Sequence, residues 1–370
     1  MKTATPQMAR AINDRLALDL LLEHGSLTAP QLRALTGLSR PTVSDLIERL
    51  RVNGLITVVG ESGEDRRGPN ARVYGIVADR AHVAGVDVRR DAVNVTVADI
   101  TGRTVGSATR PLATGRSRVT GRPRRSGDDL VEVIADAVGE AAGARRLHAV
   151  VVGAPGMVDP HSGELATDNG VPGWRPNLLQ ALRHRIDAPV TLENEVNLAA
   201  VAEHRAGAAQ GRRDFVLLWL DEWVGAAVTL DGRLRRGASG GAGEITTLGL
   251  RNGSLCDLLS AEFIDGLDEE SLAARIAEGA FVSVAVLDPG LVVLGGETGR
   301  SGGDVLAARV GEHLASLSPV PTQVRASTVE GNAILHGALF TALSIAHQDV
   351  FGEGPVQPTP PGSAPATISG

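Results

Sequence analysis

The apolar positions of the first 80 residues repeat first at the period of helices and then at the period of strands. One helix is expected along residues 7–24, and its apolar residues recur at a spacing of four: Ile12, Leu16 and Leu20. A later helix carries apolar residues at i, i+3, i+4 and i+7: Val43, Leu46, Ile47 and Leu50. This second stripe is expected to be buried.

A tight turn is expected just before that stripe. Thr28 has the capping-box spacing to Gln31, so it should start a short helix, and Gly37 should end it. Ser39 can cap the next helix, with Pro41 in its first turn. Two short helices joined by a glycine-containing turn indicate a helix-turn-helix.

Two short apolar runs follow the second of these helices. Residues 55–59 and 72–76 are typical of strands, and a polar loop with Arg66 and Arg67 separates them. A β-hairpin in this place is the wing of a winged helix-turn-helix. We assign residues 1–78 to this domain.

The second helix of the motif offers side chains suited to base edges and phosphates, most of them near its N-terminal end. The expected DNA contacts lie on this helix and on the wing: Ser39, Arg40, Thr42, Ser44, Arg49, Arg66, Arg67 and Arg72. The alternative is a three-helix bundle with a hairpin that contacts another protein. The motif alone leaves both open.

From about residue 80, strands alternate with helices, which is typical of an α/β domain. Strands are expected at residues 82–88, 92–100, 147–153, 189–192, 215–220, 223–230 and 291–294. Helices are expected at residues 128–143, 176–187, 195–210, 269–286, 303–317 and 331–349. This domain is assigned to residues 79–352, and the Pro/Gly/Ser/Thr-rich tail, residues 353–370, is expected to be disordered.

Composition and charge narrow the class of protein. The chain is 43% hydrophobic with one cysteine, Cys256, so a globular fold without an intrachain disulfide or a cysteine-rich zinc site is expected. It has no run of 18 apolar residues and no signal-peptide core, so we expect a cytoplasmic protein that is not embedded in a membrane. Residues 1–80 carry a net charge of +2 and the remainder −9. A weakly positive N-terminal domain followed by an acidic domain suits a protein that contacts DNA through its N-terminal domain.

Five motifs in the second domain occur in the order of one known family. They are residues 153–159 (GAPGMVD), 169–174 (NGVPGW), 193–195 (ENE), 237–245 (GASGGAGEI) and 288–296 (DPGLVVLGG). The series resembles the ROK family (repressors, open reading frames, kinases). With the winged helix in front, the arrangement resembles ROK transcriptional regulators. The resemblance implies an α/β fold: an actin-like, ribonuclease-H-like body of two lobes with a cleft between them.

Departures from the family pattern argue against an enzyme. The resemblance implies a glycine-containing phosphate loop in the kinases, D-x-G-x-T, where this chain has Asp87-Val88-Arg89-Arg90-Asp91. Glycine lets backbone N–H groups approach the phosphates, and Arg89 occupies the space that this approach requires. At the position of the family's catalytic aspartate stands Glu195, whose carboxylate is one methylene further out.

The resemblance also implies a sugar pocket, which this chain keeps in part. Thr247 takes the place of a sugar-binding histidine, Cys256 takes the place of a glutamate, and the family's zinc segment is shortened. We therefore expect no metal and no cofactor. The expected effector contacts are Gly156, Asn169, Asn194, Glu195 and Glu244. Asn194 and Glu195 have an alternative role, since both suit the first turn of a helix.

Three hypotheses remain. The first is a sequence-specific regulator, a repressor of carbohydrate genes, which binds a double-stranded DNA operator. Its inactive ROK body would form a homodimer or a dimer of dimers and bind a sugar or sugar-derived effector. The second is a kinase that phosphorylates hexoses with ATP and carries a DNA-binding head. The third is a dimeric DNA-binding protein that responds to no effector.

Overall fold

The computed structural model describes residues 6–62, 71–112, 129–165, 169–221, 223–250, 253–260, 264 and 266–352. The chain divides into two compact units. The first combines Met1–Arg80 with Ala346–Gly370, and the second is Ala81–Ile345. The wing residues Arg66 and Arg67 and the tail from residue 353 lie outside the described residues.

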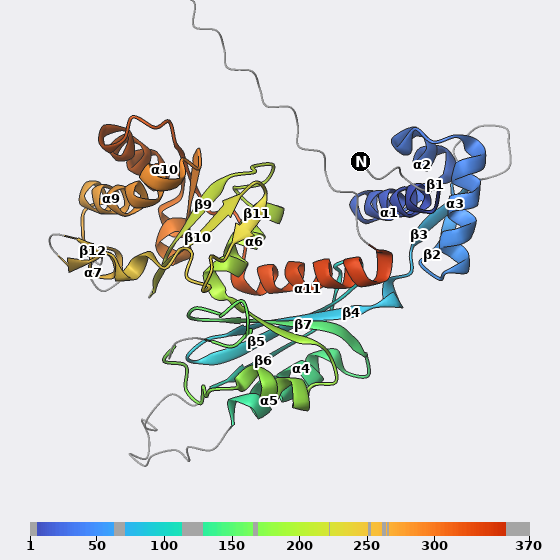
Figure 1. Ribbon diagram of the computed structural model, residues 1–370, viewed down its shortest axis with the longest axis horizontal. Coiled ribbons are helices and arrows are strands. Elements are labelled where there is room, and N and C mark those ends of the chain that lie inside the picture. The colour runs from blue at the N-terminus through green and yellow to red at the C-terminus, as the bar shows by residue number, and fades with distance from the viewer. Residues whose placement is uncertain are drawn as a thin grey trace, which may run out of the picture. The chain divides into compact units, whose positions relative to one another are not determined.

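The first unit is a winged helix fold of three helices and a small antiparallel sheet (Figure 1). Its elements are α1 (Pro6–His24), β1 (Leu27–Thr28), α2 (Ala29–Thr36), α3 (Arg40–Val52), β2 (Ile56–Ser62) and β3 (Ala71–Ile76). The strand order is β1-β3-β2. The expected helix-turn-helix and hairpin strands are confirmed.

Local capping explains where α2 and α3 begin and end. Thr28 and Gln31 form the reciprocal capping box: the Thr28 backbone N–H donates to Gln31 Oε1 at 2.8 Å, and the Gln31 N–H donates to Thr28 Oγ1 at 3.4 Å. Gly37 ends α2 with φ of 69°, a left-handed conformation that glycine adopts without strain. Ser39 caps α3 by accepting from the Thr42 N–H at 3.4 Å.

The core of the first unit uses the predicted stripe of α3 but a different face of α1. On α3, the four stripe residues are buried: Val43, Leu46, Ile47 and Leu50. On α1, the buried residues are Ala17, Leu18 and Leu21, while Ile12 is 38% exposed. A spacing of four alone drifts around a helix of 3.6 residues per turn, so it located the helix but not its buried face.

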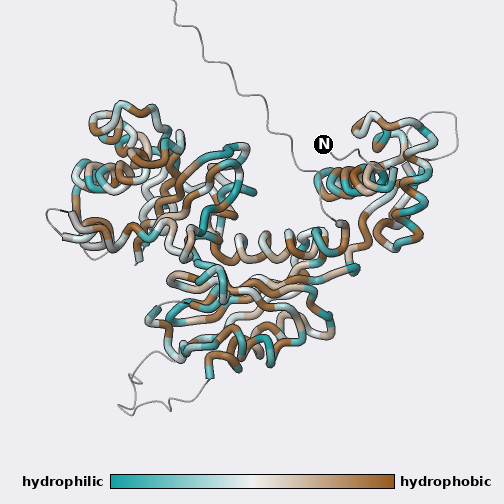
Figure 2. The backbone as a smooth tube through the Cα atoms, viewed as in Figure 1, coloured by the Kyte–Doolittle hydropathy of each residue, from teal (hydrophilic) through white to brown (hydrophobic). Residues whose placement is uncertain are grey.

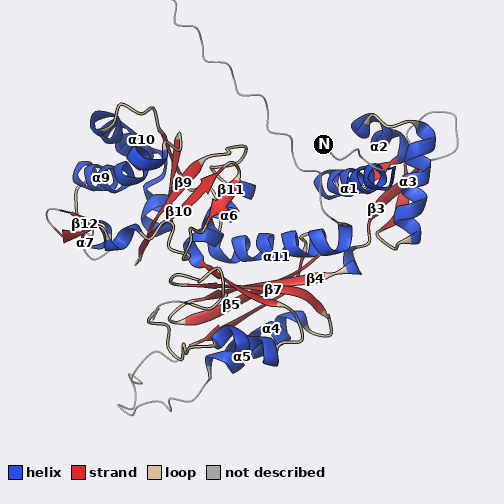
Figure 3. Ribbon diagram, in the orientation of Figure 1, coloured by secondary structure: helices blue, strands red, loops and turns tan. Residues whose placement is uncertain are grey.

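The second unit contains two lobes, each built on a five-stranded sheet with helices on both faces (Figure 3). The first lobe has strand order β6-β5-β4-β7-β8. These strands are β4 (His82–Val88), β5 (Ala92–Asp99), β6 (Thr104–Pro111), β7 (Leu147–Ala154) and β8 (Val190–Asn194). β7 and β8 run parallel to β4, whereas β5 and β6 continue the sheet as antiparallel hairpins.

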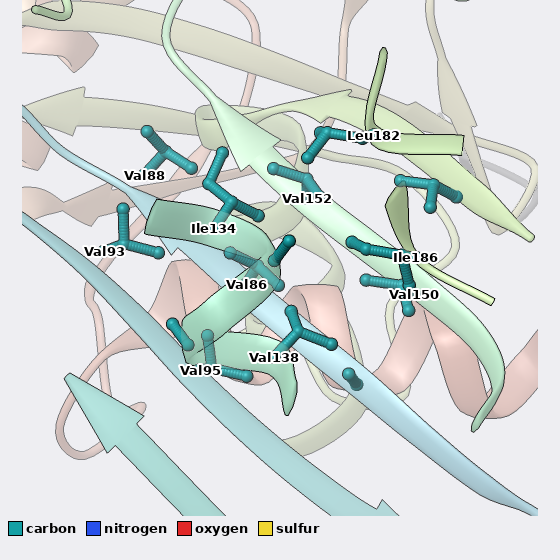
Figure 4. Close-up of a cluster of buried hydrophobic side chains, with 14 of the residues drawn as sticks. Val86, Val88, Val93, Val95, Ile134, Val138, Val150, Val152, Leu182 and Ile186 are labelled. Carbon is teal, nitrogen blue, oxygen red and sulfur yellow. The ribbon is translucent and has the colours of Figure 1, made fainter. Parts of the chain in front are cut away.

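Two helices, α4 (Leu130–Ala142) and α5 (Leu178–Arg185), cover one face of this sheet. Figure 4 shows their apolar side chains meeting those of the strands: Val86, Val88, Val93, Val95, Ile134, Val138, Val150, Val152, Leu182 and Ile186. Helix α11 (Ala333–Phe351) covers the other face. It packs so closely that a Cβ at Gly85 would lie 2.8 Å from the Leu339 backbone N.

The second lobe has strand order β11-β10-β9-β14-β15. These strands are β9 (Phe215–Leu220), β10 (Val224–Leu230), β11 (Arg233–Arg235), β14 (Leu291–Gly295) and β15 (Gln323–Ala326). Its core takes in α7 (Leu255–Leu259), α9 (Glu269–Leu287) and α10 (Gly296–Leu317), while α6 (Glu195–Ala206) packs on β9 and β10. The short elements η1 (Ala78–Arg80), η2 (Ile245–Thr247), β12 (Gly249–Leu250) and β13 (Gly253–Ser254) complete the described structure.

Hydrophobic residues follow the central strands of both sheets, and hydrophilic residues follow the outer turns (Figure 2). None of the helices in the described part of the chain has the length and apolar character needed to span a bilayer.

Candidate nucleic-acid interface and effector cavity

The N-terminal end of α3 presents polar side chains to solvent. Ser39, Arg40 and Ser44 are exposed, and Thr42 is partly buried. The Ser39 and Thr42 hydroxyl oxygens lie 2.8 Å apart and share a hydrogen bond. Arg72 is exposed on β3. A cationic and hydroxyl-bearing helix end of this kind can meet base edges and phosphates.

Arg49 of α3 forms an ion pair with Asp14 of α1. Its Nη2 lies 2.5 Å from Asp14 Oδ1, and its Nε donates to Asp14 Oδ2 at 3.2 Å. The hydrogen bond that Arg49 donates to Asp14 raises the pKa of Arg49, against the opposing effect of burial. The side chain is one third exposed. This bidentate pair fixes α3 against α1, so Arg49 has a structural role whether or not it also reaches DNA.

Two cavities open where strand ends of both lobes of the second unit meet. One of them, named the effector cavity after the effector expected there, has a volume of about 430 Å³ and is lined by residues of both lobes: Arg89, Arg90, Asp91, Pro155, Asn169, Glu195, Trp219, Asp221 and Trp223. A neighbouring cavity of about 440 Å³ shares Arg89, Asp91, Trp219 and Asp221 and reaches Arg300 and Asn332. Both volumes suit small polar ligands.

Arg89 is held at the end of β4 by a buried carboxylate. Asp87 is fully buried, and its Oδ2 accepts from Arg89 Nε at 2.9 Å and from Asn332 Nδ2 at 2.7 Å. Burial lowers the pKa of Arg89, but the charge and hydrogen bond of Asp87, together with the charges of Glu195 and Asp221, outweigh it, so the net shift is upward. The ion pair uses Nε, which leaves the two Nη groups of Arg89 for a ligand.

Glu195 is the carboxyl group with the most altered acidity in the effector cavity. Burial raises its pKa to about 7, Arg89 opposes this, and the charges of Asp87, Asp221 and Glu244 add to it. The group is therefore close to half protonated at neutral pH. It can accept a hydrogen bond when ionised and donate one when protonated.

The remaining predicted effector residues have different surroundings. Asn169 lines the cavity, accepts from the Val171 N–H at 3.0 Å, and has a buried Nδ2 with no partner among the described atoms. Asn194 caps α6 and donates Nδ2 to the Gly156 carbonyl at 3.0 Å. Burial raises the pKa of Glu244. The structure thus brings Asn169 and Glu195 to the cavity wall, whereas Asn194 and Gly156 bind one another.

Several cavity residues are absent from the sequence prediction. Arg90 lies over the Trp223 ring, 4.3 Å from its centre, in a cation–π contact. Trp219, Asp221 and Trp223 come from the end of β9 and the turn that follows it. The sequence held a signal, since two of the three tryptophans in the chain lie four residues apart around an aspartate.

The structure describes only part of the segment on which the expectation of no metal site depends. The side chains of Thr247 and Cys256 lie outside the described part of the structure. Within the described residues, no group of three or more His, Cys, Asp or Glu side chains is arranged to hold a metal ion.

Both units contain a region that matches a known protein family. Residues 83–256 match the ROK family, and residues 12–68 match the MarR family. The xylose repressor of Bacillus subtilis (strain 168) is 24% identical over 247 residues, which cover 66% of this chain and 62% of that protein. The DNA-binding transcriptional dual regulator NagC of Escherichia coli (strain K12) is 24% identical over 245 residues, 64% of this chain and 57% of that protein. The chain thus matches less than two thirds of the length of these relatives.

Solved structures support the fold. A ROK family transcriptional regulator, described as a homolog of the E. coli MLC protein, superposes with a TM-score of 0.70 at 15% identity. The match covers 93% of this chain and 100% of that one. The ROK hexokinase from Thermus thermophilus superposes with a TM-score of 0.58 at 24% identity, over 72% of this chain and 99% of that one.

Proposed function

Because this chain joins an N-terminal MarR-type winged helix domain to a ROK-family domain, we propose that it is a sequence-specific DNA-binding transcriptional repressor. The observation that carries the proposal is the exposed N-terminal end of α3, with Arg40 and Ser44, on a winged helix. Two of its relatives are named as a xylose repressor and as the DNA-binding transcriptional dual regulator NagC, which supports the proposal. A transcriptional repressor must reach the DNA inside the cell, so the proposal agrees with the expected cytoplasmic location.

We infer that the ROK domain is not a kinase. Transfer of a phosphoryl group depends on backbone N–H groups, metal ions and cations placed around the phosphates. Here Arg89 follows β4 and forms an ion pair with Asp87, so a side chain stands beside the strand end that would carry a phosphate loop. Glu195 is one methylene longer than the aspartate of the kinase pattern, so its carboxylate is displaced from the position that the pattern gives the catalytic group.

The effector cavity is proposed to bind a sugar or sugar-derived effector. Arg89 Nη groups and Asn169 Nδ2 can donate to hydroxyl oxygens, and Glu195 can accept from hydroxyl groups. Trp219 and Trp223 provide apolar surface at the same wall. A cavity with donors, acceptors and aromatic faces suits a polyhydroxylated ring.

Helix α11 offers a route by which the cavity could influence the DNA-binding unit. At its start, Asn332 accepts from the Leu335 N–H at 3.0 Å and donates to Asp87, the partner of Arg89. Its last turn belongs to the first compact unit. There Arg15 of α1 donates to the carbonyls of Gly352 at 2.6 Å and His347 at 3.3 Å. An effector that disturbs the Asp87 network would therefore act on a helix that ends on α1, provided that it binds the two states unequally.

Two half-sites on an operator call for two winged helices, so the active form is proposed to be a homodimer or a dimer of dimers. The direct test is selection of genomic fragments by the purified chain, followed by titration of the enriched fragment. A saturable complex that competes against unrelated DNA supports the proposal. Recovery of unrelated fragments only, at low and high salt, refutes it.

A further inference from the structure

The face of α3 that points away from the core is acidic at its centre. Buried residues of α3 form one stripe: Val43, Leu46, Ile47 and Leu50. With about 3.6 residues per turn, the positions opposite this stripe are Pro41, Asp45, Glu48 and Val52. Pro41, Asp45 and Glu48 are exposed, and Val52 is 76% exposed. The residues that project furthest from the domain thus include two carboxylates.

The two carboxylates differ in what they contact. Glu48 pairs with Arg51 one turn further along the helix, at 3.3 Å. Asp45 contributes its charge to the raised pKa of Arg49, but among the described residues it has no hydrogen bond or ion pair. Arg49 is already held in a bidentate pair by Asp14. Asp45 is therefore an available acceptor in the first two turns of α3, the part of a recognition helix that meets base edges.

We propose that Asp45 is a specificity-determining residue that accepts a hydrogen bond from the N4 amino group of a cytosine in the major groove. An unpaired carboxylate on a DNA-facing helix is repelled by phosphates, so a base contact is the interaction that makes it favourable. Cytosine presents an amino donor, whereas adenine presents an acceptor, N7, beside its amino group, and a carboxylate is repelled by that acceptor. This inference rests on the proposed DNA-binding function.

Selection of duplexes from a randomised library, with the full chain, tests the assignment. Wild type should enrich a site with one strongly preferred cytosine in each half-site. Asp45→Ala should lower the preference at that position about 5- to 150-fold, the factor equivalent to about 1–3 kcal/mol, and leave the other positions unchanged. Asp45→Asn should shift the preference there toward adenine, because an amide matches N6 and N7 together.

Glu23→Ala is the matched control, since it removes an exposed carboxylate from α1. It should leave every base preference unchanged. Identical preferences in wild type, Asp45→Ala and Asp45→Asn, with all variants equally stable to heat, would overturn the role of Asp45. Enrichment of no sequence by wild type would instead overturn the DNA-binding function itself, so the two failures are distinguishable.

Discussion

Arg89 Nε lies 2.9 Å from Asp87 Oδ2, which joins a partly exposed cation in the cavity to a fully buried carboxylate in β4. The pair has two consequences. It gives the buried Asp87 carboxyl group a charged hydrogen-bond donor, and it places a guanidinium at the strand end where the kinase pattern has a glycine-containing loop. The same aspartate accepts from Asn332 at the start of α11.

Loss of the Arg89 side chain should destabilise the second unit. Arg89→Ala leaves Asp87 buried with one donor fewer, and breaking such a pair costs about 3–5 kcal/mol when both partners are buried. Since Arg89 is 37% exposed, we expect about 1–3 kcal/mol, measured as the free energy of unfolding in urea. The control is Arg300→Ala, which removes an exposed pair with Glu297 and should cost less than about 1 kcal/mol. Equal losses in the two variants would contradict a special role for the Arg89 pair.

Stability should depend on pH through Glu195. Its pKa is raised by burial to about 7 from an ordinary value of 4.5, so the folded chain holds a proton that the unfolded chain releases. The stabilisation is fully present below about pH 4.5 and is lost as pH rises through 7. Glu195→Gln removes this dependence, so its stability relative to wild type should increase by up to about 3 kcal/mol between pH 5 and pH 8. The measurement is urea unfolding at the two values. A difference between variant and wild type that stays constant from pH 5 to pH 8 would show that Glu195 is not buried as a neutral group.

Arg15 should couple effector binding to DNA release. Its side chain is 14% exposed and donates hydrogen bonds to the carbonyls of His347 in α11 and of Gly352, the residue that follows α11. Arg15→Ala is expected to keep operator affinity within about threefold of wild type and to reduce release by the effector at least severalfold, because coupling between sites is typically worth about 1–3 kcal/mol. Fluorescence anisotropy of a labelled operator measures both quantities. Arg10→Ala removes an exposed arginine of the same helix and should behave as wild type. If Arg15→Ala releases the operator as fully as Arg10→Ala does, α11 is not the route.

The boundaries of α2 and α3 were predictable because single capping residues determine where these helices begin and end. Thr28 with Gln31, Gly37 and Ser39 cap two helices through contacts within four residues, and such signals are visible in the chain. The buried face of α1 was not predictable, because it depends on what α2 and β3 present to it. Strand β15 was missed because it has four residues, too few for its alternation of polar and apolar side chains to be distinctive, and it is held by parallel pairing with β14.

Some of the cavity residues that follow strands of the first lobe were predictable from the sequence. Asn169 and Glu195 lie in motifs that follow β7 and β8, and both reach the cavity wall. Trp219 and Asp221 were missed, because they belong to the other lobe and the sequence does not show which strand ends meet. The ion pair between Arg49 and Asp14 was not predictable, because the two residues lie 35 positions apart in the sequence.

The residues at the start of α3 should determine base recognition. Arg40→Ala is expected to weaken binding to the selected operator by about 1–3 kcal/mol and to relax the preference at one base pair. Arg72→Ala on β3 should weaken binding to all sequences and flatten its salt dependence, because a phosphate contact releases counterions. Titration at several salt concentrations separates the two. An unchanged slope for Arg72→Ala would argue against a phosphate contact from β3.

Transcription of a promoter that contains the selected operator, reconstituted with purified polymerase, tests the central claim most directly. Wild type should reduce the transcript in proportion to operator occupancy. A variant with Arg40→Ala and Ser44→Ala together should leave transcription near its unrepressed level, because both exposed side chains lie at the end of α3 that meets DNA. A transcript that wild type leaves unchanged at full operator occupancy, or that both proteins reduce equally, would contradict the account.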